Sequence, residues 1–487
     1  MCMLKQIVFI VFILHFTILV AQPPKKFFCR YGGNGYDVGY DLKQTSDKGY
    51  VISGSTSSFG QGNTDFYLLK LDSLGQKIFE KAFGGYNNEI AKSIVQLPDS
   101  SYILSGYTSS FGFGGYDIFI VKVDKTGNLQ WQKTIGGGDW DFSSSIINTS
   151  DGGYIICGTT YSFGYGNADG YVIKIDALGN TTWSKVFGGS KDDEFKSVIQ
   201  TNDGKYVLTG YTKSYNDSLG DIWAFKLDIN GDSIWSKYYG GNKEDFGNQI
   251  VENNASDLFI AGATESFGSG LLDAYALKLN SVGLLTNTFI NGTAANNEIY
   301  SSASICYRVS NNVISFIEYE TAPGFELQTK IIEFDFGFGY QQATDFGSTT
   351  IDETYKVITT KDKGYAVTGY TEGYNAILTD VYFIKLDSNL AGDNNSIVSV
   401  DEIEKNDLLF KIYPNPTMNK IQISSNINIS IDDLRLFDAI GNEILISTNQ
   451  IYYENKSSIS ISLETLKTGM YYLKFRNQTR KISFIHP

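Results

Sequence analysis

Short runs of alternating apolar and polar residues recur along most of the chain. The stretch DGGYIICGTTYSFG, residues 151–164, has close copies that begin at Asp47, Asp99 and Asp203, and a shorter copy begins at Asp362. Each copy alternates large apolar with small residues, which is typical of a β-strand, and carries a glycine near its centre. The recurrence predicts that one structural unit is built several times.

The repeat has a strict period of 52 residues. The same residue types return at this step at a tyrosine, a glycine, an aspartate and an aromatic position. These positions are Tyr50, Tyr102, Tyr154 and Tyr206; Gly54, Gly106, Gly158, Gly210 and Gly262; Asp65, Asp117, Asp169, Asp221 and Asp273; and Phe79, Trp131, Trp183 and Trp235. A register without insertions predicts units of the same structure.

Each unit contains four strand-like runs. In the third unit they are SSIINTS, GGYIICGTT, GYVIKID and TTWSKVFGG, with a Gly-rich loop before the third run and a tight turn after it. Four antiparallel strands in about 40–50 residues match one blade of a β-propeller. Two weaker units, at about 292–347 and 352–387, bring the number to seven.

The seventh unit lacks its fourth run, and a matching run, FFCRYGG, precedes the first unit. We therefore expect the strand 27–31 to pair with 381–386 and to close the ring, because closure removes exposed sheet edges. An open solenoid is the alternative, but it would not explain the split unit. The predicted fold is all-β: a seven-bladed β-propeller over 22–390, closed by its N-terminal strand. Its phrases G-x-T-x-S-F-G and D-x-x-G-x-x-x-W-x-K resemble those of bacterial secreted propellers, which implies a fold but no activity.

The N-terminus predicts a secretory signal peptide over residues 1–21. Lys5 precedes an apolar run from Ile7 to Val20, and cleavage is expected between Ala21 and Gln22. The run has about 14 residues, whereas a membrane-spanning helix needs about 20, so we expect no transmembrane span.

The last eighty residues leave the repeat and form further alternating runs. They predict a small Ig-like β-sandwich over 407–487, after a polar linker at 391–406. Its motifs resemble the C-terminal sorting domain of the type IX secretion system, at Tyr413, Pro414, Asn415, Pro416, Gly441 and Gly469. The resemblance implies that type IX machinery of a Bacteroidota-type bacterium moves the protein across the outer membrane. It also implies removal of this domain, with release or attachment to surface lipopolysaccharide.

Composition excludes several kinds of function. The net charge of -14 argues against a nucleic-acid partner. The two histidines, His15 and His486, lie outside the repeats, which removes Ser-His and Cys-His nucleophiles and histidine-based zinc sites there. We expect neither a cofactor nor a metal.

One set of carboxylates follows the repeat. It consists of Asp37, Glu89, Asp141, Asp193 and Asp245, all 52 residues apart. In a closed ring they share one rim, where they would form an acidic collar for a cation or basic partner. A structural role is the favoured alternative, either as turn carboxylates that bind backbone N–H groups or as partners of Lys70 and its equivalents.

Function is expected where the repeat is broken. The divergent sixth unit has an aromatic set that would stack on sugar rings or a peptide, or pack between blades: Tyr319, Phe325, Phe336, Phe338 and Tyr340. The sequence therefore predicts a secreted or surface-exposed module that binds a glycan or a protein. The alternative is a carboxylate-dependent enzyme acting on extracellular polysaccharide, which would need two or three carboxylates converging about 5–10 Å apart in a cleft.

Overall fold

The computed structural model divides into two compact units, Met1–Ser399 and Val400–Pro487. It describes residues 27–215, 219–268, 272–292, 304–308, 313–320, 328–346, 350–373, 376–388, 390, 398–399, 411–413, 420–424, 430, 434–438, 443–444, 451–455, 458–463, 466, 469–475 and 478–484. All regular elements in these residues are strands, and no helix suited to crossing a membrane occurs among them.

The first unit contains repeated antiparallel sheets of four strands, with neighbours in sequence paired side by side. The first three sheets consist of β2 (Asp37–Gln44), β3 (Tyr50–Thr56), β4 (Asp65–Leu71) and β5 (Lys77–Phe83); β6 (Glu89–Gln96), β7 (Tyr102–Thr108), β8 (Asp117–Val123) and β9 (Leu129–Ile135); and β10 (Asp141–Asn148), β11 (Tyr154–Thr160), β12 (Asp169–Ile175) and β13 (Thr181–Phe187).

The fourth to sixth sheets repeat this order. They consist of β14 (Asp193–Gln200), β15 (Tyr206–Thr212), β16 (Asp221–Leu227) and β17 (Ser233–Tyr239); β18 (Asp245–Glu252), β19 (Leu258–Thr264), β20 (Asp273–Leu279) and β21 (Leu285–Asn291); and β22 (Ile305–Arg308), β23 (Val313–Glu320), β24 (Gln328–Phe334) and β25 (Tyr340–Phe346).

The seventh sheet joins the two ends of the unit. It contains β26 (Asp352–Thr359), β27 (Tyr365–Thr371), β28 (Asp380–Leu386), β1 (Phe27–Tyr31) and the short β29 (Val398–Ser399). As the split repeat predicts, β1 is antiparallel to β28, with Phe27 opposite Lys385 and Tyr31 opposite Val381. The N-terminal strand therefore covers the edge that β28 would otherwise expose.

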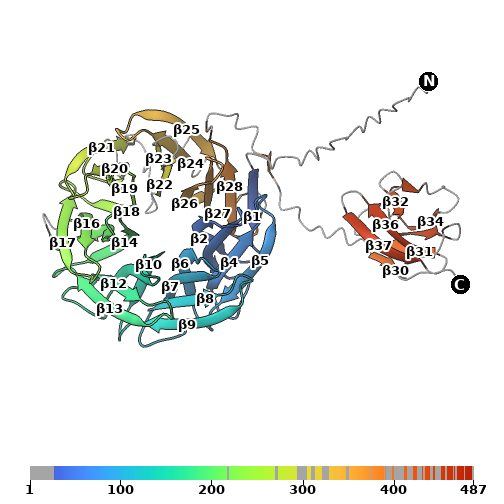
Figure 1. Ribbon diagram of the computed structural model, residues 1–487, viewed down its shortest axis with the longest axis horizontal. Coiled ribbons are helices and arrows are strands. Elements are labelled where there is room, and N and C mark those ends of the chain that lie inside the picture. The colour runs from blue at the N-terminus through green and yellow to red at the C-terminus, as the bar shows by residue number, and fades with distance from the viewer. Residues whose placement is uncertain are drawn as a thin grey trace, which may run out of the picture. The chain divides into compact units, whose positions relative to one another are not determined.

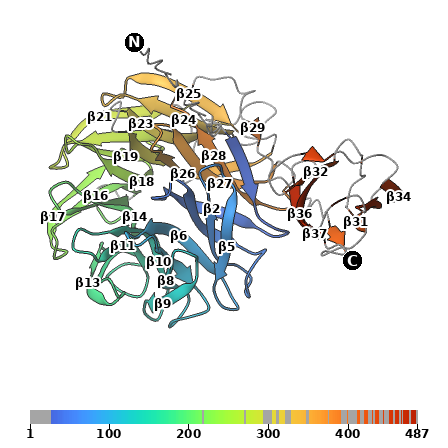
Figure 2. The ribbon, with the colours of Figure 1, turned by 45° about the vertical axis from the view of Figure 1, so that its right-hand side comes forward.

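Successive sheets lie around a common centre, as Figure 1 shows, with the first strand of a sheet innermost and the fourth outermost. The turned view in Figure 2 again places β17 and β21 at the outside and β14 and β18 further in. The first sheet also contacts the seventh: the N–H of Asp37 donates to the carbonyl of Thr379 at 2.9 Å, and Lys356 lies 3.8 Å from Asp41.

The burial of the middle strands explains why the same sequence motif recurs. Both faces of a middle strand such as β3 are buried because a neighbouring sheet covers each of them, whereas outer strands such as β5 are partly exposed. The central glycine of the repeated motif is required because the backbone of the neighbouring strand lies very close to it. A Cβ at Gly54 would lie 1.7 Å from the carbonyl oxygen of Val38, and one at Gly158 would lie 1.9 Å from that of Phe142. Glycine recurs here because no side chain fits.

The second unit contains two four-stranded sheets around one hydrophobic core. One sheet has the order β30 (Lys411–Tyr413), β31 (Lys420–Ser424), β35 (Ser458–Ser462) and β34 (Ile451–Asn455). The other has the order β33 (Glu443–Ile444), β32 (Leu434–Asp438), β36 (Gly469–Phe475) and β37 (Gln478–Phe484). Ile423 and Ile461 of the first sheet share the core with Leu436 and Leu473 of the second.

Candidate functional site

The five in-register carboxylates lie at the start of the innermost strands and are almost completely buried. Asp141 is typical. Its Oδ2 accepts the N–H of Gly137 at 2.8 Å and the hydroxyl of Ser162 at 2.7 Å, and it therefore holds two loops together. Asp37 contacts Gly33 and Ser58 in the same way, at 2.8 and 2.6 Å. This geometry matches the structural alternative for these residues.

A second buried carboxylate lies beside each of several members of this set. Gly84 is enclosed between Asp65 and Glu89: a Cβ there would lie 2.1 Å from Asp65 Oδ1 and 2.2 Å from Glu89 Oε2. Desolvation raises the pKa of Asp65, and the charge of Glu89 adds to this effect. Both side chains are at most 1% exposed, so this pair is almost completely shielded from solvent.

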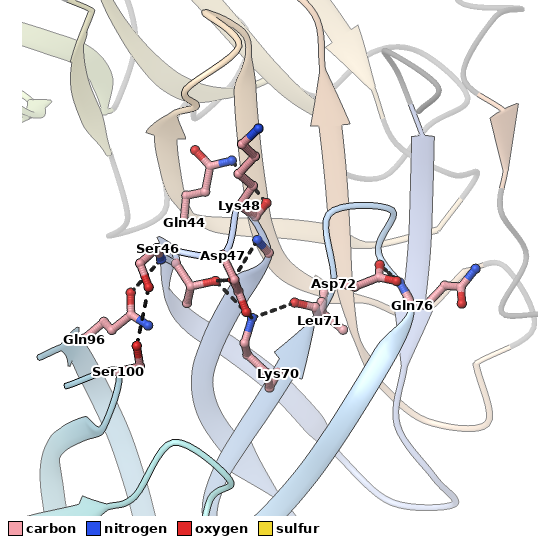
Figure 3. A network of polar contacts seen from close by, with 12 residues as sticks. Gln44, Ser46, Asp47, Lys48, Lys70, Leu71, Asp72, Gln76, Gln96 and Ser100 are labelled. Atoms are coloured by element: carbon pink, nitrogen blue, oxygen red, sulfur yellow. Dashed lines mark hydrogen bonds and ion pairs between the residues drawn. The ribbon is translucent and has the colours of Figure 1, made fainter. Parts of the chain in front are cut away.

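The in-register lysines lie at the opposite end of the sheets from Asp37. Figure 3 shows Lys70, whose Nζ donates to Thr45 Oγ1 at 2.9 Å and to the carbonyl of Leu71 at 3.0 Å, and pairs with Asp47. Lys70 lies next to the last residue of β4, whereas Asp37 begins β2. The alternative in which these carboxylates pair with Lys70 and its equivalents does not hold for Asp37, because antiparallel register places Lys70 at the opposite end of the sheet.

The aromatic candidates of the sixth repeat differ in their surroundings, since some are packed against other residues and one is exposed to solvent. Phe336 and Phe338 pack against a hydrophobic core between the fifth and sixth sheets, with their rings 5.8 and 6.0 Å from that of Phe259. Tyr340 is 65% exposed on the outermost strand β25. Phe325 and the side chain of Tyr319 lie outside the described residues.

Several predicted motif residues also lie outside the described residues. These are Ala21 and Gln22 at the expected signal cleavage, and Pro414, Asn415, Pro416 and Gly441 of the sorting motifs. Of the remaining two, Tyr413 ends β30 and Gly469 begins β36.

A different aromatic group gathers at the loops between the second and third sheets. We call Tyr107, Tyr116, Trp140, Phe142 and Tyr161 the aromatic cluster. The ring of Trp140 lies 5.9 Å from that of Tyr161 and 6.3 Å from those of Tyr116 and Phe142, mostly edge to face. Trp140 is 47% exposed and Tyr161 is 40% exposed, so the cluster presents ring surface to solvent.

More exposed aromatic side chains lie on the same face as the aromatic cluster. Asp37, Thr56 and Asp65 stand in one row across the first sheet, so the loops that precede β2 and follow β3 emerge at the same end. The loops at this end carry the exposed rings Tyr36, Tyr86, Phe113, Phe163 and Tyr165. A solvent-facing concentration of large rings is unusual for a soluble surface and often marks a binding face.

The innermost strands surround a cavity of about 450 Å³, which we call the central cavity. In six sheets of the first unit, the first strand contains one extra residue beside its partner strand. These bulge residues all line the cavity: Tyr40, Lys92, Ser144, Lys196, Asn248 and Tyr355.

The sequence contains a signal for the central cavity in the variation at one position of the repeat. The position of the five in-register carboxylates holds an acidic residue in every one of these copies. The position three residues later instead changes from tyrosine to lysine, serine, lysine and asparagine. A position with constant location and variable chemistry is where a repeat fold is free to specialise. This variation lies in the innermost strands and not in the loops.

Comparison with known proteins identifies the C-terminal unit. Residues 411–484 match the family described as the secretion system C-terminal sorting domain. This type IX sorting domain directs the protein to the cell surface or to secretion and implies interaction with the type IX machinery.

Two further proteins are similar to parts of this chain. The regulatory protein FlaEY of Caulobacter vibrioides is 24% identical over 238 residues, which cover 41% of this chain and 24% of FlaEY. The chain thus spans about a quarter of the length of this relative. The crystal structure of Sqt1 from Chaetomium thermophilum is similar with a TM-score of 0.42 and 12% identity, over 72% of this chain and 82% of that one.

Proposed function

We propose that the protein is a binding module displayed at the cell surface or secreted, built on a closed seven-bladed β-propeller over 22–390. The repeated four-stranded sheets, the pairing of β1 with β28 and the contacts of the first sheet with the seventh support this fold. The proposal includes a signal peptide at 1–21, a linker at 391–406, an Ig-like sorting domain at 407–487 and a Bacteroidota-type host.

The aromatic cluster is the observation that carries a binding function. Flat rings bind sugars through apolar contact with the C–H faces of the ring, and they bind peptides through hydrophobic and stacking contacts. Trp140 and Tyr161 are partly exposed and are also held by neighbouring rings. Their orientation is therefore fixed before a ligand arrives, which reduces the entropy lost on binding. A glycan is the favoured ligand.

A glycan-array screen of the purified first unit tests this proposal, followed by affinity measurements on variants. Trp140→Ala and Tyr161→Ala should each weaken binding of the selected glycan by about tenfold or more, with little change in melting temperature. Tyr340→Ala is the matched control, because Tyr340 is also exposed but lies on the sixth sheet. Loss of binding in Tyr340→Ala with full binding in Trp140→Ala would move the site to the sixth sheet and contradict this assignment.

A further inference from the structure

The central cavity has a strongly asymmetric charge. Four lysines line it: Lys43, Lys92, Lys196 and Lys356. Of the described residues lining it, Asp41 is the one carboxylate, although the chain as a whole carries a net charge of -14. Such a concentration of cations in an acidic protein is costly unless an anion is present to offset it.

The one lining carboxylate is already engaged. Asp41 contacts Lys43 Nζ at 2.9 Å and lies 3.8 Å from Lys356 Nζ. It also accepts the hydroxyl of Ser93 and the N–H of Ile94, both at 3.0 Å. This carboxylate therefore joins the first sheet to its neighbours, and the charge of Lys92 is left to be balanced by another group.

Lys92 has an aromatic rather than an acidic partner. Its Nζ lies 3.6 Å from the centroid of the Tyr40 ring, and the ring of Tyr355 lies 4.8 Å from that of Tyr40. Burial, followed by repulsion from Lys196, lowers the pKa of Lys92 from its ordinary value of 10.5 to about 8, against a weaker attraction by Glu353. A partly buried ammonium group in this environment gains more than a fully exposed one from a bound anion.

Asn248, which also lines the cavity, carries a second hydrogen-bond donor. Nδ2 of Asn248 is buried and makes no hydrogen bond within the described residues. An amide N–H group left unsatisfied in this way costs free energy, and a ligand oxygen would remove that cost. Asn248, Lys92 and Lys196 occupy the same bulge position in different sheets.

We propose that the central cavity binds a small oxyanion, a sulfate, phosphate or carboxylate group, between Lys92, Lys196 and Asn248. The volume of about 450 Å³ is larger than an inorganic anion requires, and it accommodates a sugar acid that carries such a group. Lys196 is also paired with Glu194 at 2.8 Å, so its ammonium is held in place while its remaining N–H groups are available to the anion. None of the five residues of the aromatic cluster lines the central cavity.

Calorimetric titration of the mature protein tests the proposal, with sodium sulfate, sodium phosphate, sodium glucuronate and neutral glucose as probes at low ionic strength. At least one anion should bind, and glucose should not. Lys92→Met and Lys196→Met should each weaken that binding by about tenfold or more, because each removes a charge-assisted hydrogen bond. Binding of glucuronate alone would identify a sugar acid as the source of the anion, and binding of sulfate or phosphate would identify a free inorganic anion.

The matched control is Lys81→Met, which removes an exposed lysine of β5 and should leave the affinity unchanged. A second measurement requires no variant: the bound anion should raise the melting temperature of the native protein more than sodium chloride of equal ionic strength. Absence of binding by every anion, or equal affinity in the native protein, Lys92→Met and Lys196→Met, would overturn the proposal. Trp140→Ala should bind the anion normally, so failure here is distinguishable from failure of the aromatic cluster.

Discussion

Arg30 of β1 forms an ion pair with Asp380 of β28, which lies 350 positions later in the chain. Asp380 is 1% exposed and also borders Gly32, where the chain turns toward the first sheet. The contact therefore fixes the strand that joins the two ends of the repeat region. It also ties together residues that are far apart in sequence, so its formation requires the intervening sheets to be in place.

Loss of β1 should destabilise the whole first unit. Phe27 is 1% exposed and its ring lies 5.8 Å from that of Phe383, so Phe27→Ala should cost about 3 kcal/mol of unfolding free energy. Deletion of residues 25–30 should cause a larger fall in melting temperature or aggregation. Removal of the second unit, residues 400–487, serves as the control and should leave the melting of the first unit nearly unchanged. Unchanged melting after deletion of β1 would contradict the closed ring that we propose.

The buried carboxylates should behave as structural groups. Asp193 accepts the N–H of Gly189 at 2.8 Å and the hydroxyl of Ser214, so Asp193→Ala should cost about 2–4 kcal/mol of stability. Ser214→Ala should cost less, and the double variant should cost less than the two losses combined, since both changes disrupt one network. Denaturant unfolding measures all three. Small additive losses would point away from a structural role for this set.

The sequence predicts the sheets well because their causes are local and repeated. Gly54 and its equivalents recur because each lies against a carbonyl of the neighbouring strand, and this requirement is the same in every copy. The aromatic cluster is harder to predict. Tyr107, Trp140 and Tyr161 belong to three separate segments of the second and third repeats. Only the packing of these neighbouring sheets brings them together.

The bulges make the central cavity difficult to predict from the sequence. An extra residue such as Lys92 interrupts the alternation of inward and outward side chains, so sequence periodicity places it on the wrong face. Phe336 and Phe338 show the opposite difficulty. Their variation suggests a ligand, but the neighbouring fifth sheet offers Phe259 and Phe289 as packing partners.

Asp151 should make stability depend on pH in a defined window. Desolvation raises the pKa of Asp151, but hydrogen bonds from Thr149 and Lys174 outweigh it and lower the pKa from 3.8 to about 2. Because the pKa is lowered by folding, this stabilisation is complete above about pH 4 and is lost as the pH falls toward 2. Asp151→Asn should cost about 1 kcal/mol at pH 7, a modest value because the carboxylate is half exposed.

The measurement is the difference in unfolding free energy between the native protein and Asp151→Asn as a function of pH. This difference should close between about pH 4 and pH 2. In a Lys174→Met background the effect of Asp151→Asn should shrink, since the buried ammonium is its main partner at 2.9 Å. A difference that is constant with pH would show that the carboxylate charge has no part in it.

Export should remove the C-terminal unit. Protein recovered from the cell surface or the medium should begin near Gln22 and should lack the residues after about Asn406, because the sorting domain at 411–484 serves export. Intact-mass spectrometry checks both ends. Protein retained inside a strain without the type IX machinery is the control and should keep the domain. An exported chain with its full C-terminus would contradict the expected processing.

Gly115 offers a way to disturb the aromatic cluster without removing a ring. A Cβ at Gly115 would lie 2.0 Å from Trp140 Cδ1 and 2.1 Å from its Nε1, so Gly115→Ala must displace the indole. Because Trp140 is 47% exposed, the ring has solvent to move into, and the loss of stability should stay below about 1 kcal/mol. The affinity for the selected glycan should nevertheless fall by about tenfold, since the orientation of the ring is lost.

Gly138→Ala is the matched control for Gly115→Ala. It introduces the same methyl group into the loop that carries Trp140, but a Cβ at Gly138 meets no atom within 4 Å. Its affinity and melting temperature should therefore equal those of the native protein. Equal glycan affinity in both variants, together with a crystal structure showing a displaced indole in Gly115→Ala, would mean that the ligand does not use the Trp140 ring. A selective loss in Gly115→Ala would instead show that binding depends on the position of that ring, because the two changes differ only in what the added methyl group meets.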